Sequence, residues 1–131
     1  MTPNLSPPSI ILHVGRDLSL LNSRSMVLRS AGYIVECKYT IEDAVRHFLS
    51  SDFDLVLLCH SLSEEERQCF VNRIREHGDL TPVLSVGLFY TLNSQQGIRD
   101  DLRTENGPIG LLNCIAQTLQ KDRAAHSTQR H

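Results

Sequence analysis

The chain has 131 residues, of which 40% are hydrophobic and 21% are charged, a balance typical of one globular domain with a single core. Its formal net charge of −2 provides no basic surface for nucleic acid or anionic lipid. No apolar stretch is long enough to span a membrane, and the first residues lack the segments of a signal peptide. We therefore expect a cytoplasmic protein whose four cysteines, at positions 37, 59, 69 and 114, are reduced thiols.

Both ends of the chain differ in composition from the middle. Residues 1–9 are rich in Pro, Ser and Asn, and the Pro7-Pro8 pair fits neither a helix nor a central strand. Residues 121–131 are polar and show no periodicity. We therefore predict a disordered N-terminus, a disordered C-terminal tail, and one folded domain at 10–120 without internal repeats.

The first half of this domain alternates between strand and helix patterns. Short apolar and β-branched runs predict buried strands at 10–14 and 33–39. A helix between them ends at Ser30, shortly before Gly32 as its cap, and a second helix begins at Ile41. The apolar faces predicted for these two helices are Leu18, Leu21 and Leu28 in the first, and Ile41, Ala44, Val45, Phe48 and Leu49 in the second.

The centre of the chain carries the most continuous apolar run. Residues 53–59 lack polar alternation, which predicts a strand buried on both faces, as in a parallel sheet. Ser63 and Glu66 have the spacing of a capping box at the start of a third helix. This helix extends to His77 and ends before Gly78.

The last third is less regular. Residues 81–87 predict a fourth strand, with its proline near the start. We place a short helix near 92–97 and a weak, polar strand near 99–104. Pro108 suits the first turn of a final helix. The residues of this helix that we expect to face inward are Leu111, Leu112, Ile115 and Leu119.

Strand–helix units in series with short connections predict an open parallel sheet covered by helices on both faces. The expected architecture is a single-domain α/β, flavodoxin-like (βα)5 three-layer sandwich with strand order 2-1-3-4-5. Such sheets bind ligands at the carboxyl ends of their strands, beside the point where the strand order reverses. The residues predicted there are Gly15, Arg16, Asp17, Cys59, His60 and Gly87.

These elements together resemble the receiver domain of bacterial two-component response regulators. Residues 10–62 resemble its first three units, 81–87 resemble its fourth strand, and the Gly-Pro pair ending at Pro108 resembles the approach to its last helix. The resemblance covers most of 10–120 and is clear as far as Gly87. It implies a role in two-component or phosphorelay signal transduction, in which a histidine kinase donates a phosphoryl group to an aspartate. That transfer uses carboxylates that hold Mg²⁺, a lysine, and a Thr or Ser.

The positions that would carry this chemistry have all changed. The acidic pair falls on Gly15 and Arg16, the nucleophilic aspartate falls on Cys59, and the hydroxyl residue falls on Gly87. No lysine occurs between positions 38 and 121, and no aromatic residue follows position 90. We therefore predict a pseudo-receiver that has lost the Mg²⁺ site, is not phosphorylated and is not an enzyme. It would act through protein–protein contacts with a kinase or output protein in trans, or as a homodimer through its fourth and fifth units.

The nearby carboxylates do not replace the missing aspartate. Asp54 precedes Cys59 by five residues, which places it about 16 Å away at roughly 3.3 Å per strand residue. The glutamates at 64–66 belong to the first turn of a helix, where the helix dipole and solvent account for them. Asp17 is best explained as a helix N-cap.

Arg16 and Cys59 each allow a structural and a functional interpretation. Arg16 is either a solvated loop cation or a fixed positive charge in place of Mg²⁺. Cys59 is either an inert buried thiol or, if a nearby cation and helix start lower its pKa, the nucleophile of a redox or small-ligand sensor. With His60 and His13 it could also bind Zn²⁺ if the three side chains converged.

Overall fold

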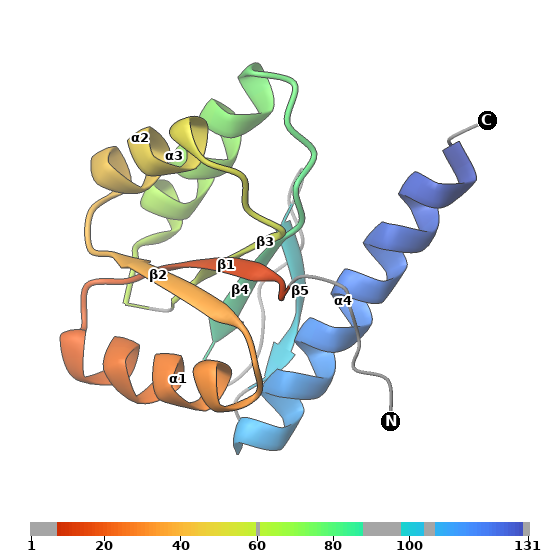
Figure 1. Cartoon of the computed structure of the whole chain (residues 1–131). Helices are drawn as coiled ribbons and strands as arrows, with labels where there is room; N and C mark the ends of the chain where they lie inside the picture. Colours follow the sequence, from red (N-terminus) through yellow and green to blue (C-terminus); the bar gives the residue numbers. More distant parts are fainter. Residues whose placement is uncertain (1–7, 60, 88–97, 104–106, 130–131) are drawn as a thin grey trace.

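A computed structural model of the chain describes residues 8–59, 61–87, 98–103 and 107–129, and these form a sheet between two layers of helices (Figure 1). The strands are β1 (Ile10–Val14), β2 (Ile34–Lys38), β3 (Leu55–Leu58), β4 (Val83–Gly87) and β5 (Ile98–Arg103). The helices are α1 (Leu18–Ser30), α2 (Ile41–Ser50), α3 (Glu64–Glu76) and α4 (Gly107–Gln129). The strands are parallel in the order β2-β1-β3-β4-β5, which confirms the predicted topology. The short helix predicted near 92–97 lies outside the described residues.

Local sequence signals set the helix ends. Thr40 caps α2 by accepting a hydrogen bond from the backbone N–H of Asp43 at 3.2 Å. Ser63 and Glu66 form the predicted capping box at the start of α3, with reciprocal hydrogen bonds of 3.0 and 2.9 Å. The glycines at positions 32 and 78 adopt φ angles of 100° and 79° just beyond α1 and α3, a backbone region that favours glycine.

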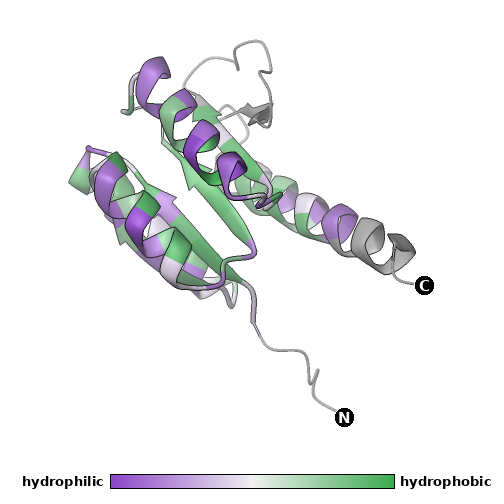
Figure 2. Cartoon of the chain, turned by 90° about the horizontal axis from the view of Figure 1, so that it is seen from above, coloured by the Kyte–Doolittle hydropathy of each residue, from purple (hydrophilic) through white to green (hydrophobic). Residues whose placement is uncertain are grey.

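The core lies on both faces of the sheet, and the hydrophobic strands lie between helices whose outer surfaces are more polar (Figures 1 and 2). Alternate residues of each strand face opposite layers. Toward α2 and α3 the buried side chains are Leu12, Val14, Ala44, Val45, Phe48, Val56, Leu58, Leu62, Phe70, Val71, Ile74 and Val83. Toward α1 and α4 they are Ile11, Leu28, Val35, Leu55, Leu57, Leu84, Val86, Leu111, Ile115 and Leu119.

Two leucines that were predicted to face inward are exposed. Leu18 in α1 is 54% exposed and Leu49 in α2 is 44% exposed. Leu18 is the first residue of its helix, and Leu49 lies in the last turn of its own. Both leucines thus lie in end turns, and the side chains that α1 and α2 bury lie between the ends of these helices.

Helix α4 is longer than the sequence pattern predicts. The predicted inward side chains of Leu111, Ile115 and Leu119 are buried. The backbone then stays helical to Gln129, where the polar composition predicts a disordered tail from 121. No Pro or Gly follows position 110, and Ala, Lys, Arg and Gln favour helix, so a polar segment can continue an existing helix. Among the described residues, no helix has both the length and the apolar character needed to cross a membrane.

Candidate functional site

The carboxyl ends of the central strands bring the predicted site residues to one edge of the sheet. Gly15 directly follows β1, Cys59 directly follows β3, and Gly87 is the last residue of β4. The backbone N–H of Gly15 donates to the carbonyl of Lys38 at 3.1 Å. The backbone N–H of Cys59 donates to the carbonyl of Val14 at 2.9 Å. The strand ends are therefore held in register where this fold class places its functional crevice.

At the centre of this edge, Gly15 is packed against its neighbours so closely that no side chain fits. A Cβ atom at this position would lie 2.8 Å from Leu21 Cδ1, 2.9 Å from Cys59 Cβ and 3.0 Å from Cys59 Sγ. Real Cβ contacts are longer than this, so even an alanine would force Leu21 or Cys59 to move. The space that the receiver resemblance assigns to a carboxylate is filled by carbon and sulfur.

The Cys59 side chain is 1% exposed and takes part in a series of polar contacts. Its Sγ atom lies 3.1 Å from His13 Nε2 and accepts a hydrogen bond from the Arg24 guanidinium, also at 3.1 Å. On the other side of the ring, His13 Nδ1 lies 2.9 Å from Ser25 Oγ. Ser25 Oγ is in turn 3.1 Å from Cys37 Sγ. We call Cys37, Ser25, His13 and Cys59 the buried polar chain.

Burial controls the charge states of His13 and Cys59 in the buried polar chain. It raises the pKa of the Cys59 thiol to about 11, although the Arg24 cation opposes the shift. Burial, followed by the positive charges of Arg24 and Arg29, lowers the pKa of His13 to about 3. The prediction that the pKa of Cys59 could be low is therefore wrong, because desolvation of a thiolate outweighs one adjacent cation. At neutral pH Cys59 and His13 are therefore both neutral.

The zinc interpretation is only partly supported by this arrangement. His13 and Cys59 do converge, but His60 lies outside the described residues. Cys37 contacts Ser25, and Ser25 contacts Nδ1 of the His13 ring. Cys59 contacts the other ring nitrogen, Nε2, so Cys37 and Cys59 lie on opposite sides of the ring. Within the described ranges no group of three His, Cys, Asp or Glu side chains is placed to hold a metal ion. The Cys59–His13 contact is thus a hydrogen bond between two core side chains.

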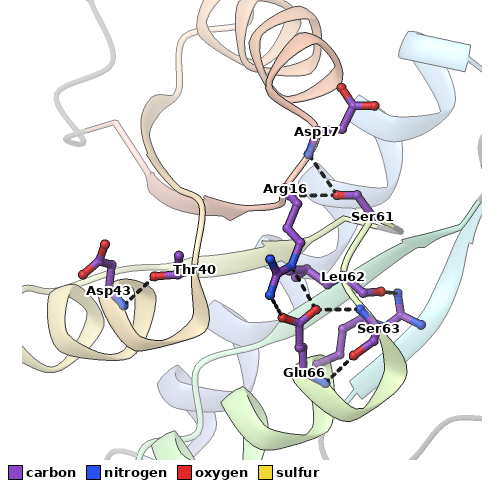
Figure 3. A network of polar contacts seen from close by, with 9 residues as sticks. Arg16, Asp17, Thr40, Asp43, Ser61, Leu62, Ser63 and Glu66 are labelled. Atoms are coloured by element: carbon purple, nitrogen blue, oxygen red, sulfur yellow. Dashed lines mark hydrogen bonds and ion pairs between the residues drawn. The ribbon is translucent and has the colours of Figure 1, made fainter.

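The exposed rim of the same edge is organised by Arg16. Its guanidinium forms an ion pair with the carboxylate of Glu66 at the start of α3, including a hydrogen bond of 3.3 Å from Nε (Figure 3). Ser61 Oγ accepts hydrogen bonds from the backbone N–H groups of Arg16 at 2.9 Å and Asp17 at 3.4 Å. The hydrogen bond from Arg16 lowers the pKa of Glu66, and the same contact raises the pKa of Arg16. Arg16 is therefore a solvated loop cation, with 56% of its side chain exposed, and it is paired with Glu66.

Sequence analysis did not find the Arg16–Glu66 pair, because the two residues are 50 positions apart. The only signal for it was that both residues follow strands whose carboxyl ends meet at one edge. The Glu66 carboxylate thus has two partners, the Ser63 backbone in the capping box and the Arg16 guanidinium. The helix dipole and solvent alone were an incomplete explanation for this glutamate.

Among the residues that the structure describes, the carboxylates near this edge are not grouped as oxygen ligands for Mg²⁺. Asp17 caps α1 as predicted, with Oδ1 accepting from the backbone N–H of Leu20 at 3.1 Å. Glu66 is paired with a cation. Asp54 lies at the opposite edge of the sheet, where its carboxylate accepts from the backbone N–H of Ile10 at 2.8 Å. Mg²⁺ requires near-octahedral oxygen coordination, and each of these three carboxylates is already engaged in another contact.

An open parallel sheet in the order β2-β1-β3-β4-β5 with helices on both faces defines the flavodoxin-like class of α/β proteins. Within that class the chain has the fold of CheY-like response-regulator receiver domains. It is similar to a CheY-like receiver domain protein from Methanospirillum hungatei, with a TM-score of 0.76, 20% identity, and coverage of 90% of this chain and 98% of the other. It is also similar to the chemotaxis protein CheY4 of Vibrio cholerae, with a TM-score of 0.70, 22% identity, and coverage of 84% and 98%.

A further similar structure is a chain from the complex of histidine kinase ThkA with response regulator protein TrrA. The TM-score is 0.71 at 16% identity, and the match covers 83% of this chain and 97% of the other. A scan against models of known protein families found no match, and a search of curated protein sequences also found none. At identities this low the similarity establishes the receiver fold, and any functional argument must come from the residues of this chain.

Proposed function

We propose that this chain is a receiver-like signalling domain that does not accept a phosphoryl group and acts through protein–protein contacts. The observation that carries the proposal is the state of Cys59. It stands at the end of β3, where the receiver resemblance implies the nucleophilic aspartate, and it is buried and hydrogen-bonded to His13 and Arg24. A cytoplasmic location and the absence of catalytic turnover are parts of the same proposal.

Phosphoryl transfer needs an accessible nucleophile and positive charge placed around the phosphoryl oxygens. A thiol with a pKa of about 11 is almost entirely protonated at neutral pH and therefore a poor nucleophile. The Arg16 guanidinium at the rim is neutralised by Glu66. Gly15 has no room for a metal-binding side chain. Loss of the Mg²⁺ site, as proposed here, follows from these substitutions together.

The redox-sensor interpretation has less support. A sensing thiol needs thiolate character and access to solvent. Cys59 has neither, since burial raises its pKa and only 1% of the residue is exposed. We therefore retain the signalling proposal alone.

The proposed partner is a signalling protein in trans, either a histidine kinase or an output protein. The receiver-fold neighbours include a complex of a kinase with a response regulator, which supports a kinase as one class of partner. A homodimer through the fourth and fifth units stays a prediction, because positions 88–97 and 104–106 in that part of the chain lie outside the described residues.

Incubation with acetyl phosphate and Mg²⁺, followed by intact-mass spectrometry, tests the proposal. We expect no change in mass, whereas a receiver domain that retains its aspartate, treated in parallel, should gain one phosphoryl group. A phosphoryl adduct on this chain would overturn the proposal. An adduct on Cys59 or Asp17 would in addition show that the phosphorylation mechanism has been rebuilt at this edge.

A further inference from the structure

The buried polar chain crosses the sheet from its edge strand to its centre, and the proposed function uses only its Cys59 end. It begins at Cys37 on β2, continues through Ser25 on α1 and His13 on β1, and ends at Cys59 beyond β3. His13 and Ser25 are fully buried, and Cys37 is half-buried. Hydrogen bonds among buried groups must each have one donor and one acceptor, so the protons of this chain can be counted.

Two proton arrangements in which every hydrogen bond of the chain donates in the same direction are compatible with the heavy-atom positions. In the first, the Cys59 thiol donates to His13 Nε2, His13 Nδ1–H donates to Ser25 Oγ, and the Ser25 hydroxyl donates to Cys37 Sγ. In the second, every donor is reversed, so that the Cys37 thiol donates to Ser25, Ser25 donates to Nδ1, and Nε2–H donates to Cys59 Sγ. A neutral imidazole permits either arrangement because it has one donor and one acceptor nitrogen.

Arg24 distinguishes the two arrangements. A guanidinium can only donate, so the contact between Arg24 and Cys59 Sγ uses an acceptor position on the sulfur. In the first arrangement the Cys59 thiol still has an acceptor for its own proton, namely His13 Nε2. In the second, the sulfur would accept from both His13 and Arg24. The thiol proton would then have no acceptor among the contacts that the structure describes for Cys59, inside a site closed to water.

The second arrangement becomes favourable when the side chain at position 59 carries a negative charge. An anion at this position has no proton to donate and accepts well from both Nε2–H and the Arg24 guanidinium. The positive charges of Arg24 and Arg29 act on His13 and oppose a second proton on the ring, while Asp17 is the carboxylate that acts on position 59. The ring would therefore exchange one proton position for the other and stay neutral.

We infer that the buried polar chain is a proton relay: His13 carries its proton on Nδ1 while Cys59 is a thiol, and negative charge at position 59 moves that proton to Nε2. The change reverses the donors in the hydrogen bonds of Ser25 and Cys37. A charge at the end of β3 therefore alters hydrogen bonds in α1 and on the edge strand β2. The relay goes beyond the proposed function, since it depends on the core contacts of this chain and not on any partner.

Long-range ¹H–¹⁵N correlation spectra of the histidine rings test the relay in the full chain. The protein has six histidines, and the His13 signals can be identified by their loss in a His13→Gln variant. In the unmodified protein we expect Nδ1 to be protonated and Nε2 to be unprotonated. In Cys59→Asp we expect the reverse, seen as an exchange of the two ¹⁵N shift ranges between the ring nitrogens.

Two further variants make the result decisive. Cys69→Asp places the same charge on the exposed cysteine of α3, outside the relay, and should leave the His13 tautomer unchanged. Cys59→Asn is a neutral variant whose amide can donate to Nε2 and accept from Arg24, so it should keep the proton on Nδ1. The spectrum of the unmodified protein tests the resting arrangement even if Cys59→Asp does not fold. A protonated Nε2 in the unmodified protein or in Cys59→Asn would overturn the inference. In folded Cys59→Asp, an unchanged tautomer or protonation of both nitrogens would overturn it as well.

Discussion

The interior and the rim of the carboxyl edge lie only a few residues apart along the chain, yet they are held together by different forces. In the interior, Gly15, Cys59 and His13 are in contact, closed to water, and neutral. At the rim, the Arg16 and Glu66 side chains form an ion pair with 56% and 24% of their surfaces exposed. Packing and desolvation dominate in the interior, whereas screened charge–charge attraction acts at the rim.

This contrast shows why the two regions differ in how readily they could provide a carboxylate for a metal ion. A carboxylate in the interior would need new space as well as a new side chain, because Leu21 and Cys59 occupy the volume beside Gly15. At the rim, a carboxylate is already present on Glu66 but is neutralised by Arg16. The packing of the interior is therefore a stronger obstacle to an added carboxylate than the ion pair at the rim.

The largest effect that we predict concerns His13 and acidic pH. The pKa of His13 is about 3 in the folded protein, against 6.5 for an unperturbed histidine. Between these two values the unfolded chain binds a proton at His13 and the folded chain does not. The free energy of unfolding should therefore fall as pH decreases below about 6.5, by roughly 1.4 kcal/mol per pH unit from this one group, for a total on the order of 4 kcal/mol near pH 3. Denaturant unfolding between pH 7 and pH 4 measures this slope.

His13→Gln is the control for this experiment, because glutamine can form hydrogen bonds but does not titrate. The variant should start from a lower stability at neutral pH and show a shallower dependence on pH, with the difference in slope corresponding to one proton. Parallel slopes in the two proteins would show that the histidine is protonated in the folded state, which would contradict the neutral interior described here.

The next effect is steric and comes from Gly15. Gly15→Asp restores a carboxylate, but its Cβ would collide with Leu21 and Cys59. We expect the free energy of unfolding to fall by about 1–3 kcal/mol, as for other overpacked core positions. Gly15→Ala is the matched variant, because it adds the same Cβ without the charge. If thermal and denaturant unfolding showed Gly15→Ala to be as stable as the unmodified protein, Leu21 and Cys59 could move aside without cost. The packing around Gly15 would then be less tight than these distances imply.

The smallest effect should come from the rim. Glu66→Gln retains an oxygen for the capping box while removing the charge that pairs with Arg16. Because the pKa of Glu66 is lowered in the folded state, the ion pair stabilises the fold above the pKa of the unfolded carboxyl group, and this contribution is lost as pH falls through the lower folded value. We expect a small loss of stability at neutral pH that disappears in high salt.

Glu64→Gln is the appropriate comparison for Glu66→Gln. Glu64 lies in the same first turn of α3 and is exposed, so it shares the helix-dipole environment of Glu66. Unfolding curves at low and high salt should show a greater salt-dependent loss for Glu66→Gln than for Glu64→Gln. Equal losses for both variants would mean that the helix dipole, and not Arg16, accounts for the stabilisation.

The sequence by itself determined the strand order and most element boundaries of the described fold, because these depend on local features. The unbroken apolar run of β3, the capping box at Ser63 and Glu66, and the glycines that follow α1 and α3 all act within a few residues. It also identified Cys59 and Gly15 as neighbours at one sheet edge, since parallel strands place their carboxyl ends together. The exposed leucines were missed because an apolar pattern does not show how the end turns of a helix are covered. The length of α4 was missed because its polar last residues show no apolar periodicity.

Only the tertiary structure decided the chemical state of the site. The Arg16–Glu66 pair joins residues 50 positions apart, and the contact between His13 and Cys59 joins residues 46 positions apart. The sequence placed a cation near a thiol and so suggested a lowered pKa for Cys59. The structure raises that pKa, because the free energy of a charge depends on how much water surrounds it, and burial results from the packing of the whole chain.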